Sequence, residues 1–366
     1  EERYNAINKG LGLKLSLKEQ FETIKKNFES KAGKDYAASR GEYLNGIIMA
    51  NYLGYEFIDA ASVICFDPEG EFDGEKTNKV MADRLANVEK AVIPGFYGAM
   101  PNGEVKTFSR GGSDVTGSIV ARAIKADVYE NWTDVSGFLM ADPRIVKDPK
   151  PISTVSYKEL RELSYMGAAV MHEDTVFPVV KLEIPINIRN TNKPEDNGTL
   201  IVKNADYYQS SLSVSGISGK TGYTTILVER AKMNEEPQLR AEILDIFAER
   251  NITVKNILSG IDSLHIIVHE SDVKNCQAEI TEEIWARVPS GNVTVTEGVA
   301  LIAVIGRELG TSPAIAVRVL GALANRKINV KLIDHGAQKI NMTVGVDSAD
   351  YEAAVQAIYT EFAKAE

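Results

Sequence analysis

From residue 1 to about residue 205, helical and strand patterns of apolar residues alternate along the chain. Ser39–Leu53 predicts a helix, and Ser39 followed by Glu42 has the spacing of a capping box at its start. Short apolar runs predict strands at Tyr55–Asp59, Lys90–Gly95 and Ala126–Trp132. Alternating helices and strands predict an α/β domain whose largely parallel sheet is covered by helices on both faces.

Beyond about residue 206 the pattern repeats itself. Pro237 and Leu239–Arg250 align without a gap with Pro313 and Ile315–Arg326, a shift of 76 residues (313 − 237). Each copy predicts a strand, a polar loop, an amphipathic helix and two strands around a glycine. A small sheet with helices on one face, which is an α+β unit, buries such a pattern.

The chain length supports this division, because 366 residues exceed what one ordinary core holds and predict two or three domains. We expect the α/β part to end in the polar stretch Asn204–Ser211. The expected domains are residues 1–205, 206–295 and 296–366.

Composition narrows the classes of function. The chain is 44% hydrophobic and 25% charged, which is typical of a globular protein, and no apolar run approaches the roughly 20 residues of a membrane helix. A net charge of −10 argues against a nucleic-acid partner. Cys65 and Cys276 lie far apart and the start lacks a signal-peptide pattern, so we expect a cytoplasmic location. His265 and His269 lie in a strand-like run without metal-ligand spacing, so we expect no protein-built metal site.

Candidate chemistry centres on Thr107–Gly117. This segment supplies the cation Arg110, two adjacent glycines, Ser113 and Asp114 just before a helical pattern. Adjacent glycines and a helix N-terminus let backbone N–H groups hold an anion, and an arginine can bind a carboxylate or phosphate with two hydrogen bonds. On these residues alone, a glycine turn with a surface Arg–Asp pair is an equal alternative. The polar segment Trp132–Gly137, in the same domain, favours anion binding.

An ordered set of segments resembles the signatures of aspartate kinases, within the amino-acid kinase superfamily. The segments are Ser39–Glu42, Ser109–Asp114, Trp132–Gly137, Asp142–Arg144, Gly167–His172, Ile184–Thr191 and Gly198–Ile201. The repeated pattern beyond residue 206 is similar to the ACT domain, which binds amino acids in metabolic regulation. Two such domains in one chain can pair side by side, and a second chain can extend the pairing by symmetry.

The resemblance implies transfer of the γ-phosphoryl group of ATP, with Mg²⁺, to the β-carboxylate of L-aspartate in lysine, threonine and methionine biosynthesis. Since a carboxylate is already a nucleophile at neutral pH, no general base is required. The implied aspartate-binding residues are Arg110 and Glu42, and Ser113 and Asp114 are implied to line the space between aspartate and the γ-phosphate. The implied nucleotide contacts are Thr133, Asp134, Leu139, Arg144, Ala169 and Val170.

Plainer interpretations of these residues stay open. Glu42 also fits a helix-capping role, and Asp134 and Arg144 also fit a solvated turn with an Asp–Arg pair. The family pattern differs in two places, because Ala169 stands where many relatives have a phosphate-side lysine and Leu139 where an aromatic residue is usual.

A further departure concerns the start of the family pattern. No Lys-Phe-Gly-Gly-Ser-type loop is present, so we expect the first strand and its phosphate lysine to precede residue 1, and no activity without them. The departures leave a second hypothesis, a non-catalytic amino-acid sensor with a degenerate kinase domain.

The ACT resemblance implies feedback inhibition by lysine, threonine or both, in a homodimer or a dimer of dimers. The implied effector residues are Met233, Glu236, Leu239, Thr253, Val254 and Lys255, where loop N–H groups and a helix N-terminus can hold a carboxylate. Lysine-inhibited relatives have an acid at the position of Lys255. A lysine effector would therefore need Glu235, Glu236 or Asp262 instead, and the effector is undecided.

Overall fold

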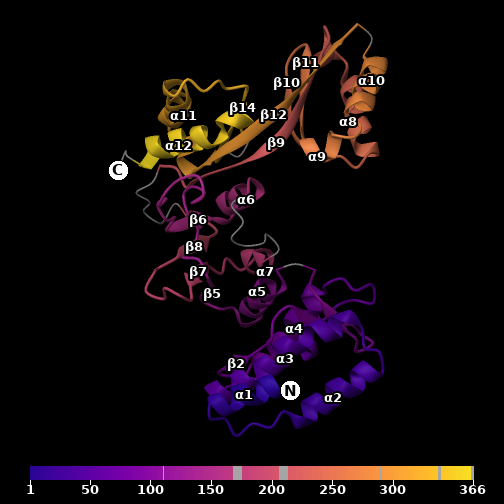
Figure 1. Cartoon of the computed structure of the whole chain (residues 1–366), viewed down its shortest axis with the longest axis vertical. Helices are drawn as coiled ribbons and strands as arrows, with labels where there is room; N and C mark the ends of the chain where they lie inside the picture. Colours follow the sequence, from indigo (N-terminus) through magenta and orange to yellow (C-terminus); the bar gives the residue numbers. More distant parts are fainter. Residues whose placement is uncertain (110, 168–174, 206–212, 289, 337–338, 364–366) are drawn as a thin grey trace. The chain divides into compact units, whose positions relative to one another are not determined.

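The computed structural model in Figure 1 describes residues 1–109, 111–167, 175–205, 213–288, 290–336 and 339–363. The chain folds into two compact units. Unit 1 comprises Glu1–Gly137, Ser153–Tyr157 and Ala169–Ala205, and unit 2 comprises Phe138–Ile152, Lys158–Ala168 and Asp206–Glu366. No helix of the described ranges is long and apolar enough to cross a membrane.

Unit 1 alternates helices with short strands. Its helices are α1 (Glu2–Gly10), α2 (Lys18–Glu29), α3 (Lys34–Leu53), α4 (Gly74–Leu85), α5 (Gly112–Ile124) and α7 (Phe177–Val180). Its strands are β1 (Glu56–Phe57), β2 (Ala91–Val92), β3 (Tyr97–Ala99), β4 (Val105–Thr107), β5 (Tyr129–Thr133), β6 (Thr154–Ser156), β7 (Ile186–Asn190) and β8 (Thr199–Val202). The pairs β1–β2, β5–β7 and β6–β8 are parallel, whereas β3–β4 and β7–β8 are antiparallel. The predicted α/β class is confirmed.

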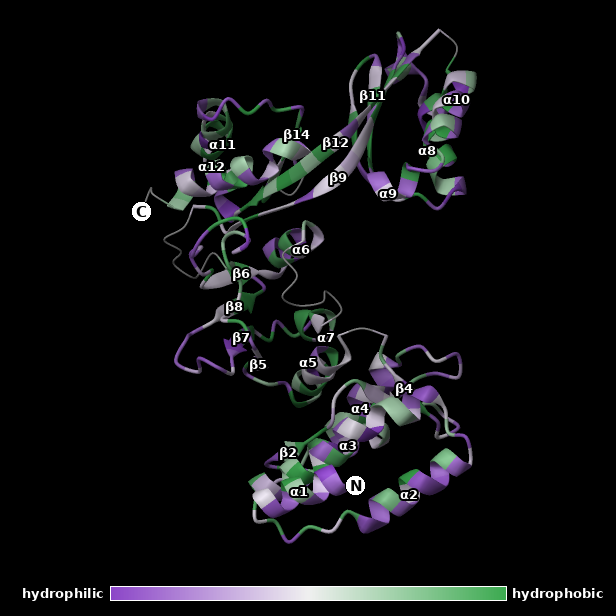
Figure 2. Ribbon diagram, viewed as in Figure 1, coloured by the Kyte–Doolittle hydropathy of each residue, from purple (hydrophilic) through white to green (hydrophobic). Residues whose placement is uncertain are grey.

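Two apolar clusters hold the helices of unit 1 in place. One joins α2 to α3 through Ile24, Leu44 and Ile48. The other contains Met81 of α4, Ile119 of α5 and Tyr97 of β3. The outer faces of α1 and α2 are largely hydrophilic, as Figure 2 shows. Tyr43 of α3 packs against both clusters, so both hold the helix that carries Glu42.

The predicted start of α3 is wrong. The helix begins at Lys34 after Gly33, five residues before Ser39, so Ser39 lies inside it and does not cap it. Ser39 is fully buried, and its hydroxyl donates to the Tyr36 carbonyl oxygen at 2.8 Å. An acid in the first turn, Asp35, favours the earlier start through the helix dipole. Because Ser39 does not cap the helix, Glu42 has no capping role, and its side chain is exposed.

Unit 2 contains a six-stranded sheet in the order β10-β11-β9-β12-β14-β13. Its strands are β9 (Gly216–Glu229), β10 (Val254–Ser259), β11 (Ser263–His269), β12 (Asn292–Ile305), β13 (Leu332–His335) and β14 (Asn341–Asp347). Its helices are α6 (Tyr157–Tyr165, apart from its first residue), α8 (Pro237–Glu249), α9 (Glu270–Val273), α10 (Gln277–Arg287), α11 (Pro313–Asn325) and α12 (Tyr351–Ala363). The predicted α+β class of this region is confirmed, and His265 and His269 lie on a strand as expected.

The long strands β9 and β12 serve two cores. They pair antiparallel along most of their length, and each has 14 residues. One core packs the second half of β9 and the first half of β12 under α8 and α10; the other packs the remaining halves under α11 and α12. The expected boundary between residues 295 and 296 falls inside β12, because this continuous strand contributes to both cores.

The predicted repeat is confirmed in the packing. Positions related by 76 residues are equally buried on α8 and α11, namely Leu239 and Ile315, Ile243 and Val319, and Phe247 and Leu323. Both helices are followed by a left-handed residue, Asn251 at φ 53° and Lys327 at φ 57°. The same apolar spacing therefore produces the same helix with the same buried face, and a left-handed residue follows it in each copy.

Two segments within residues 1–205 pack in unit 2. The Ile217 N–H donates to the Met140 carbonyl oxygen at 2.7 Å, and Met140 is buried in the core under α11 and α12. On α6, the fully buried Glu159 accepts a hydrogen bond from the Ser215 hydroxyl at 2.5 Å. Residues 1–205 therefore do not form a single compact unit, because apolar and polar partners of 138–152 and 158–168 lie beyond residue 205.

Candidate active site

The N-terminus of α5 is built on glycine. Gly111 has the left-handed φ of 60°, and Gly112 lies so close to a neighbouring turn that a Cβ there would be 2.7 Å from the Cβ of Phe96. Side chains at either position would strain or displace this turn. The Phe96 N–H in turn donates to the Thr116 hydroxyl at 3.0 Å. The glycines thus let the backbone of this segment pack closely. The first N–H groups of α5 have no partner within the helix, and Ser113 in this first turn is exposed.

Asp114 lies in the first turn of α5 and is held from β5. Its Oδ1 accepts a hydrogen bond from Asn131 Nδ2 at 3.0 Å, and its backbone carbonyl oxygen accepts one from the Tyr129 hydroxyl at 3.1 Å. Burial raises the pKa of Tyr129 to about 12, so this phenol is a donor at neutral pH. Gly117 leaves room for the ring, because a Cβ there would be 2.5 Å from the Tyr129 hydroxyl. The half-buried carboxylate is therefore oriented before any ligand binds.

The carboxyl ends of the parallel strands β5 and β7 lie side by side. Thr133 ends β5, and its carbonyl oxygen accepts hydrogen bonds from the N–H and the hydroxyl of Thr191, at 2.8 and 2.9 Å. Asp134 follows with an exposed side chain, and its Oδ1 accepts from the Thr133 hydroxyl at 3.3 Å. Ligands bind at such strand ends in open α/β sheets, so this edge is suited to a polar ligand.

Glu42 is connected to the same region through the first turn of α3. The carboxylate of Asp35 accepts a hydrogen bond from the Thr107 N–H at 3.2 Å, at the end of β4. That strand leads into the Ser109–Asp114 segment. One contact therefore ties the helix carrying Glu42 to the segment carrying Ser113 and Asp114.

Leu139 and Arg144 belong to unit 2, whereas the residues above belong to unit 1. The Arg144 side chain is exposed and binds the Asp142 carboxylate with Nε to Oδ1 at 3.0 Å and Nη2 to Oδ2 at 2.6 Å. These hydrogen bonds lower the pKa of Asp142. The Asp–Arg pair that the sequence left as an alternative is thus formed. Arg110, Ala169 and Val170 lie outside the described residues.

The predicted effector residues gather around the start of α8 and around β10. Met233 and Leu239 are buried in the core, so their side chains are not available to a ligand. Glu236 precedes α8 and forms two hydrogen bonds with Arg230, at 2.9 and 3.0 Å.

Thr253, just before β10, is exposed, and Val254, at the start of β10, is half-buried. The Lys255 ammonium lies 5.2 Å from the centre of the Tyr165 ring, at the end of α6. The predicted effector positions therefore combine an acid and a cation.

Sequence reasoning missed Tyr129, Asn131 and Arg230. Tyr129 and Asn131 are two positions apart on β5, so both side chains lie on the same face of the strand, the one toward α5. That spacing was visible in the sequence, but their partner on α5 was not. No group of three or more His, Cys, Asp or Glu side chains with metal-site geometry occurs among the described residues.

Two parts of the chain match known protein families. Residues 4–190 match the amino acid kinase family, and residues 302–362 match an ACT domain. The kinase match covers both Glu42 and the Ser109–Asp114 segment.

The chain is also similar to several aspartokinases. It is 33% identical to aspartokinase 3 of Bacillus subtilis over 337 residues, which are 90% of this chain and 74% of that protein. The crystal structure of Clostridium acetobutylicum aspartate kinase shares 47% identity with a TM-score of 0.90, over 99% of this chain and 83% of that one. Escherichia coli aspartokinase III in complex with aspartate and ADP shares 25% identity with a TM-score of 0.70, over 99% and 87% of the two chains. The same protein has been solved with lysine and aspartate, with 25% identity, a TM-score of 0.70 and coverage of 94% and 81%.

Proposed function

The chain belongs to the aspartokinase family, so it is a kinase that phosphorylates aspartate with ATP, and we propose that unit 1 holds the aspartate side of its active site. The observation that carries this assignment is the carboxylate of Asp114, at the N-terminus of α5, which accepts a hydrogen bond from Asn131 of β5. It lies four residues after Arg110, in the glycine-rich turn.

In the proposed site, Arg110 binds a carboxylate of aspartate and Glu42 binds its ammonium group. An oxygen of the β-carboxylate attacks the γ-phosphorus of ATP, and the bond between that phosphorus and the bridging oxygen of ADP breaks. No proton has to be removed from the nucleophile, so alignment and charge stabilisation supply the catalysis. Ser113 and the N–H groups at the start of α5 lie where negative charge develops, and Asp114 lines the same space.

The nucleotide is proposed to bind along the carboxyl end of β5. The exposed Asp134 accepts hydrogen bonds from the ribose hydroxyls, and Thr133 contacts the nucleotide beside it. Arg144 contacts phosphate in this proposal, and it exchanges its Asp142 partner for a phosphate oxygen to do so. Leu139, Ala169 and Val170 complete the nucleotide contacts that the family resemblance implies.

Magnesium fits this donor set. Mg²⁺ usually takes one or two carboxylates together with phosphate oxygens and water, so a preformed cluster of protein ligands is not needed. Asp114 is the residue proposed to face it, directly or through water. The ion supplies neutralisation of phosphate charge.

Unit 2 is proposed to bind a feedback amino acid, lysine, threonine or both. Escherichia coli aspartokinase III has been solved with lysine, which supports an amino-acid effector. Glu236 would bind the effector's ammonium group and the N–H groups at the start of α8 its carboxylate. We also propose a homodimer or a dimer of dimers formed through the ACT domains.

The proposal is tested by trapping the acyl phosphate with hydroxylamine. With ATP, Mg²⁺ and aspartate, we expect aspartyl hydroxamate, and less of it when lysine or threonine is added. Arg110→Ala should raise the Michaelis constant for aspartate at least about tenfold, since a charge-assisted pair is lost, with that for ATP little changed. Asp134→Ala is the matched control and should raise the Michaelis constant for ATP, with that for aspartate little changed.

Two outcomes would contradict the proposal. Unchanged aspartate kinetics in Arg110→Ala would remove Arg110 from the substrate site. No hydroxamate, alongside measurable amino-acid binding, would favour the non-catalytic sensor.

A further inference from the structure

Arg40 is a buried cation that the proposed active site does not use. Its side chain is only 9% exposed, and the rings of Tyr36, Tyr43 and Tyr97 lie 4.4, 4.5 and 5.5 Å from its Cζ. Among the described residues it forms no ion pair with a carboxylate, and its hydrogen-bond acceptor is the Ser39 hydroxyl, at 3.2 Å from Nε and 3.0 Å from Nη2. A buried guanidinium has five N–H donors and a large desolvation cost. Stacking on tyrosine offsets part of that cost and leaves donors unused.

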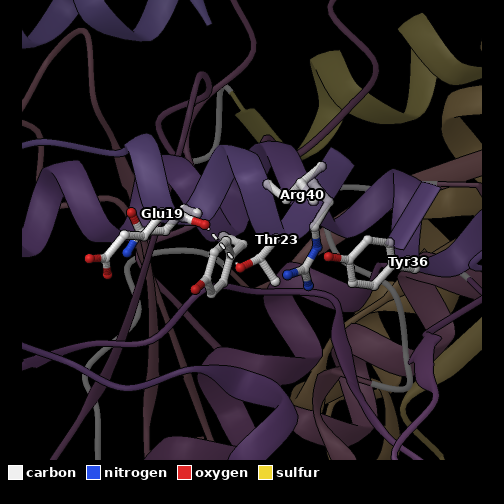
Figure 3. A pocket seen from close by; sticks show the side chains of 7 residues that line it. Glu19, Thr23, Tyr36 and Arg40 are labelled. Carbon is white, nitrogen blue, oxygen red and sulfur yellow. Dashed lines mark hydrogen bonds between the residues drawn. The ribbon is translucent and has the colours of Figure 1, made fainter. Parts of the chain in front are cut away.

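The guanidinium lines a pocket of about 170 Å³ between α2 and α3 (Figure 3). In this view it lies between the Tyr36 ring and the Thr23 side chain, and the Glu19 carboxylate points away from it. Glu19 is exposed at the rim and leaves Arg40 unpaired.

Two phenol groups add donors to the same pocket. The Tyr36 hydroxyl accepts from Asn27 Nδ2 at 2.7 Å, so its own hydrogen is available to a ligand. The Tyr43 hydroxyl has no hydrogen-bond partner among the described residues, and burial raises the pKa of Tyr43, which keeps the phenol protonated. One cation and two O–H donors therefore face a common space.

We propose that this pocket binds a small, singly charged carboxylate through the Arg40 guanidinium and the Tyr36 and Tyr43 hydroxyls. A planar carboxylate matches the planar guanidinium and accepts further hydrogen bonds at its remaining lone pairs. A phosphate dianion fits less well, because the lining contains one cation and an acid, Glu19, at the rim.

The pocket is separate from the proposed aspartate site. Arg40 and Glu42 are two residues apart on α3, so their side chains leave the helix about 200° apart. Glu42, Ser113 and Asp114 do not line the pocket. The inference therefore goes beyond the kinase function and does not depend on it.

Thermal unfolding in sodium acetate, compared with sodium chloride at equal ionic strength, tests the proposal. A ligand that binds the folded state raises Tm. We expect the Tm of the wild-type protein to be about 2 °C higher in acetate than in chloride, and we call this difference the acetate increment. Arg40→Met should abolish this increment, whereas Arg110→Ala, in the proposed substrate site, should retain it. Comparing acetate with chloride within each variant cancels any loss of basal stability. If Arg40→Met does not fold, the double variant Tyr36→Phe with Tyr43→Phe keeps the stacked rings and should reduce the increment.

The opposite results overturn the proposal. Equal acetate increments in the wild type and Arg40→Met, or no increment in the wild type, would leave Arg40 a purely structural residue. An increment lost only in Arg110→Ala would place the acetate in the substrate site. Stabilisation through Arg40 by inorganic phosphate but not by acetate would exclude a carboxylate as the ligand class.

Discussion

The two modules of unit 2 share an apolar pattern but differ in their polar loops. The first module contains α8, β10 and β11, and the second contains α11, β13 and β14, with equivalent residues 76 apart. Before α8, Arg230 and Glu236 form an ion pair with two hydrogen bonds; the equivalent residues before α11 are Gly306 and Ser312.

The adjacent strands diverge in the same way. Lys255 lies against the Tyr165 ring, whereas its equivalent Lys331 pairs with Asp347 at 2.5 Å. Positions that build the core have kept their apolar character, and positions in the loops have changed their chemistry. The fold of each module and the chemistry of its loops are therefore specified by different residues.

The largest expected effect tests whether both cores are equally necessary. Phe247→Ala and Leu323→Ala remove equivalent, fully buried side chains, and each should lower the free energy of unfolding of unit 2 by about 2–5 kcal/mol. Urea unfolding of each variant measures the loss. Glu249→Ala and Asn325→Ala, at exposed positions near the same helix ends, are the controls and should change it by less than about 0.5 kcal/mol. A small loss in only one core variant would contradict the equivalence.

A smaller effect tests whether the effector binds only the first module. Glu236→Gln removes the proposed partner of the effector's ammonium group and should raise the inhibitory concentration of the amino acid about tenfold. Ser312→Ala, at the equivalent position of the second module, should leave inhibition unchanged. The measurement is kinase activity against effector concentration. The reverse order of effects would move the effector site to the second module.

The smallest effect concerns effector identity. Lys255→Ala removes a cation near the proposed site, so inhibition by lysine should become stronger by a few fold, with threonine inhibition little changed. Lys331→Ala is the matched control, since its charge is paired within the second module. Titrating both amino acids against both variants measures the difference. Equal changes for lysine and threonine would show that Lys255 does not sense the effector's charge.

Local patterns were read correctly where a long apolar period decided the structure. The repeat aligns Leu239–Arg250 with Ile315–Arg326 and predicts an amphipathic helix in each copy, and these stretches fall on α8 and α11, which end at Glu249 and Asn325. Short-range polar signals were less reliable. Ser39 and Glu42 match a capping box, but the helix begins at Lys34, and in this earlier turn Tyr36 contacts Asn27 and Phe28 of α2. Propensity and capping are weak preferences that tertiary contacts override.

In the candidate site, the sequence identified Asp114 but not the residues that hold it. Asn131 and Tyr129 lie about fifteen residues later, and only the packing of β5 against α5 brings them to Asp114. Arg40 shows the same limit. The sequence gives no sign that this arginine is buried among tyrosines without a carboxylate partner.

The sequence by itself determined the alternation of helices and strands, the internal repeat and the glycine-rich turn before α5. These features follow from the spacing of apolar residues along the chain and from the conformational freedom of glycine, both of which neighbouring residues specify. Tertiary structure alone decided that residues 138–152 and 158–168 pack in unit 2, and that β9 and β12 are shared between two cores. The physical reason is that burial is a property of contacts between distant segments, and many pairings satisfy the same apolar pattern until the whole chain has folded.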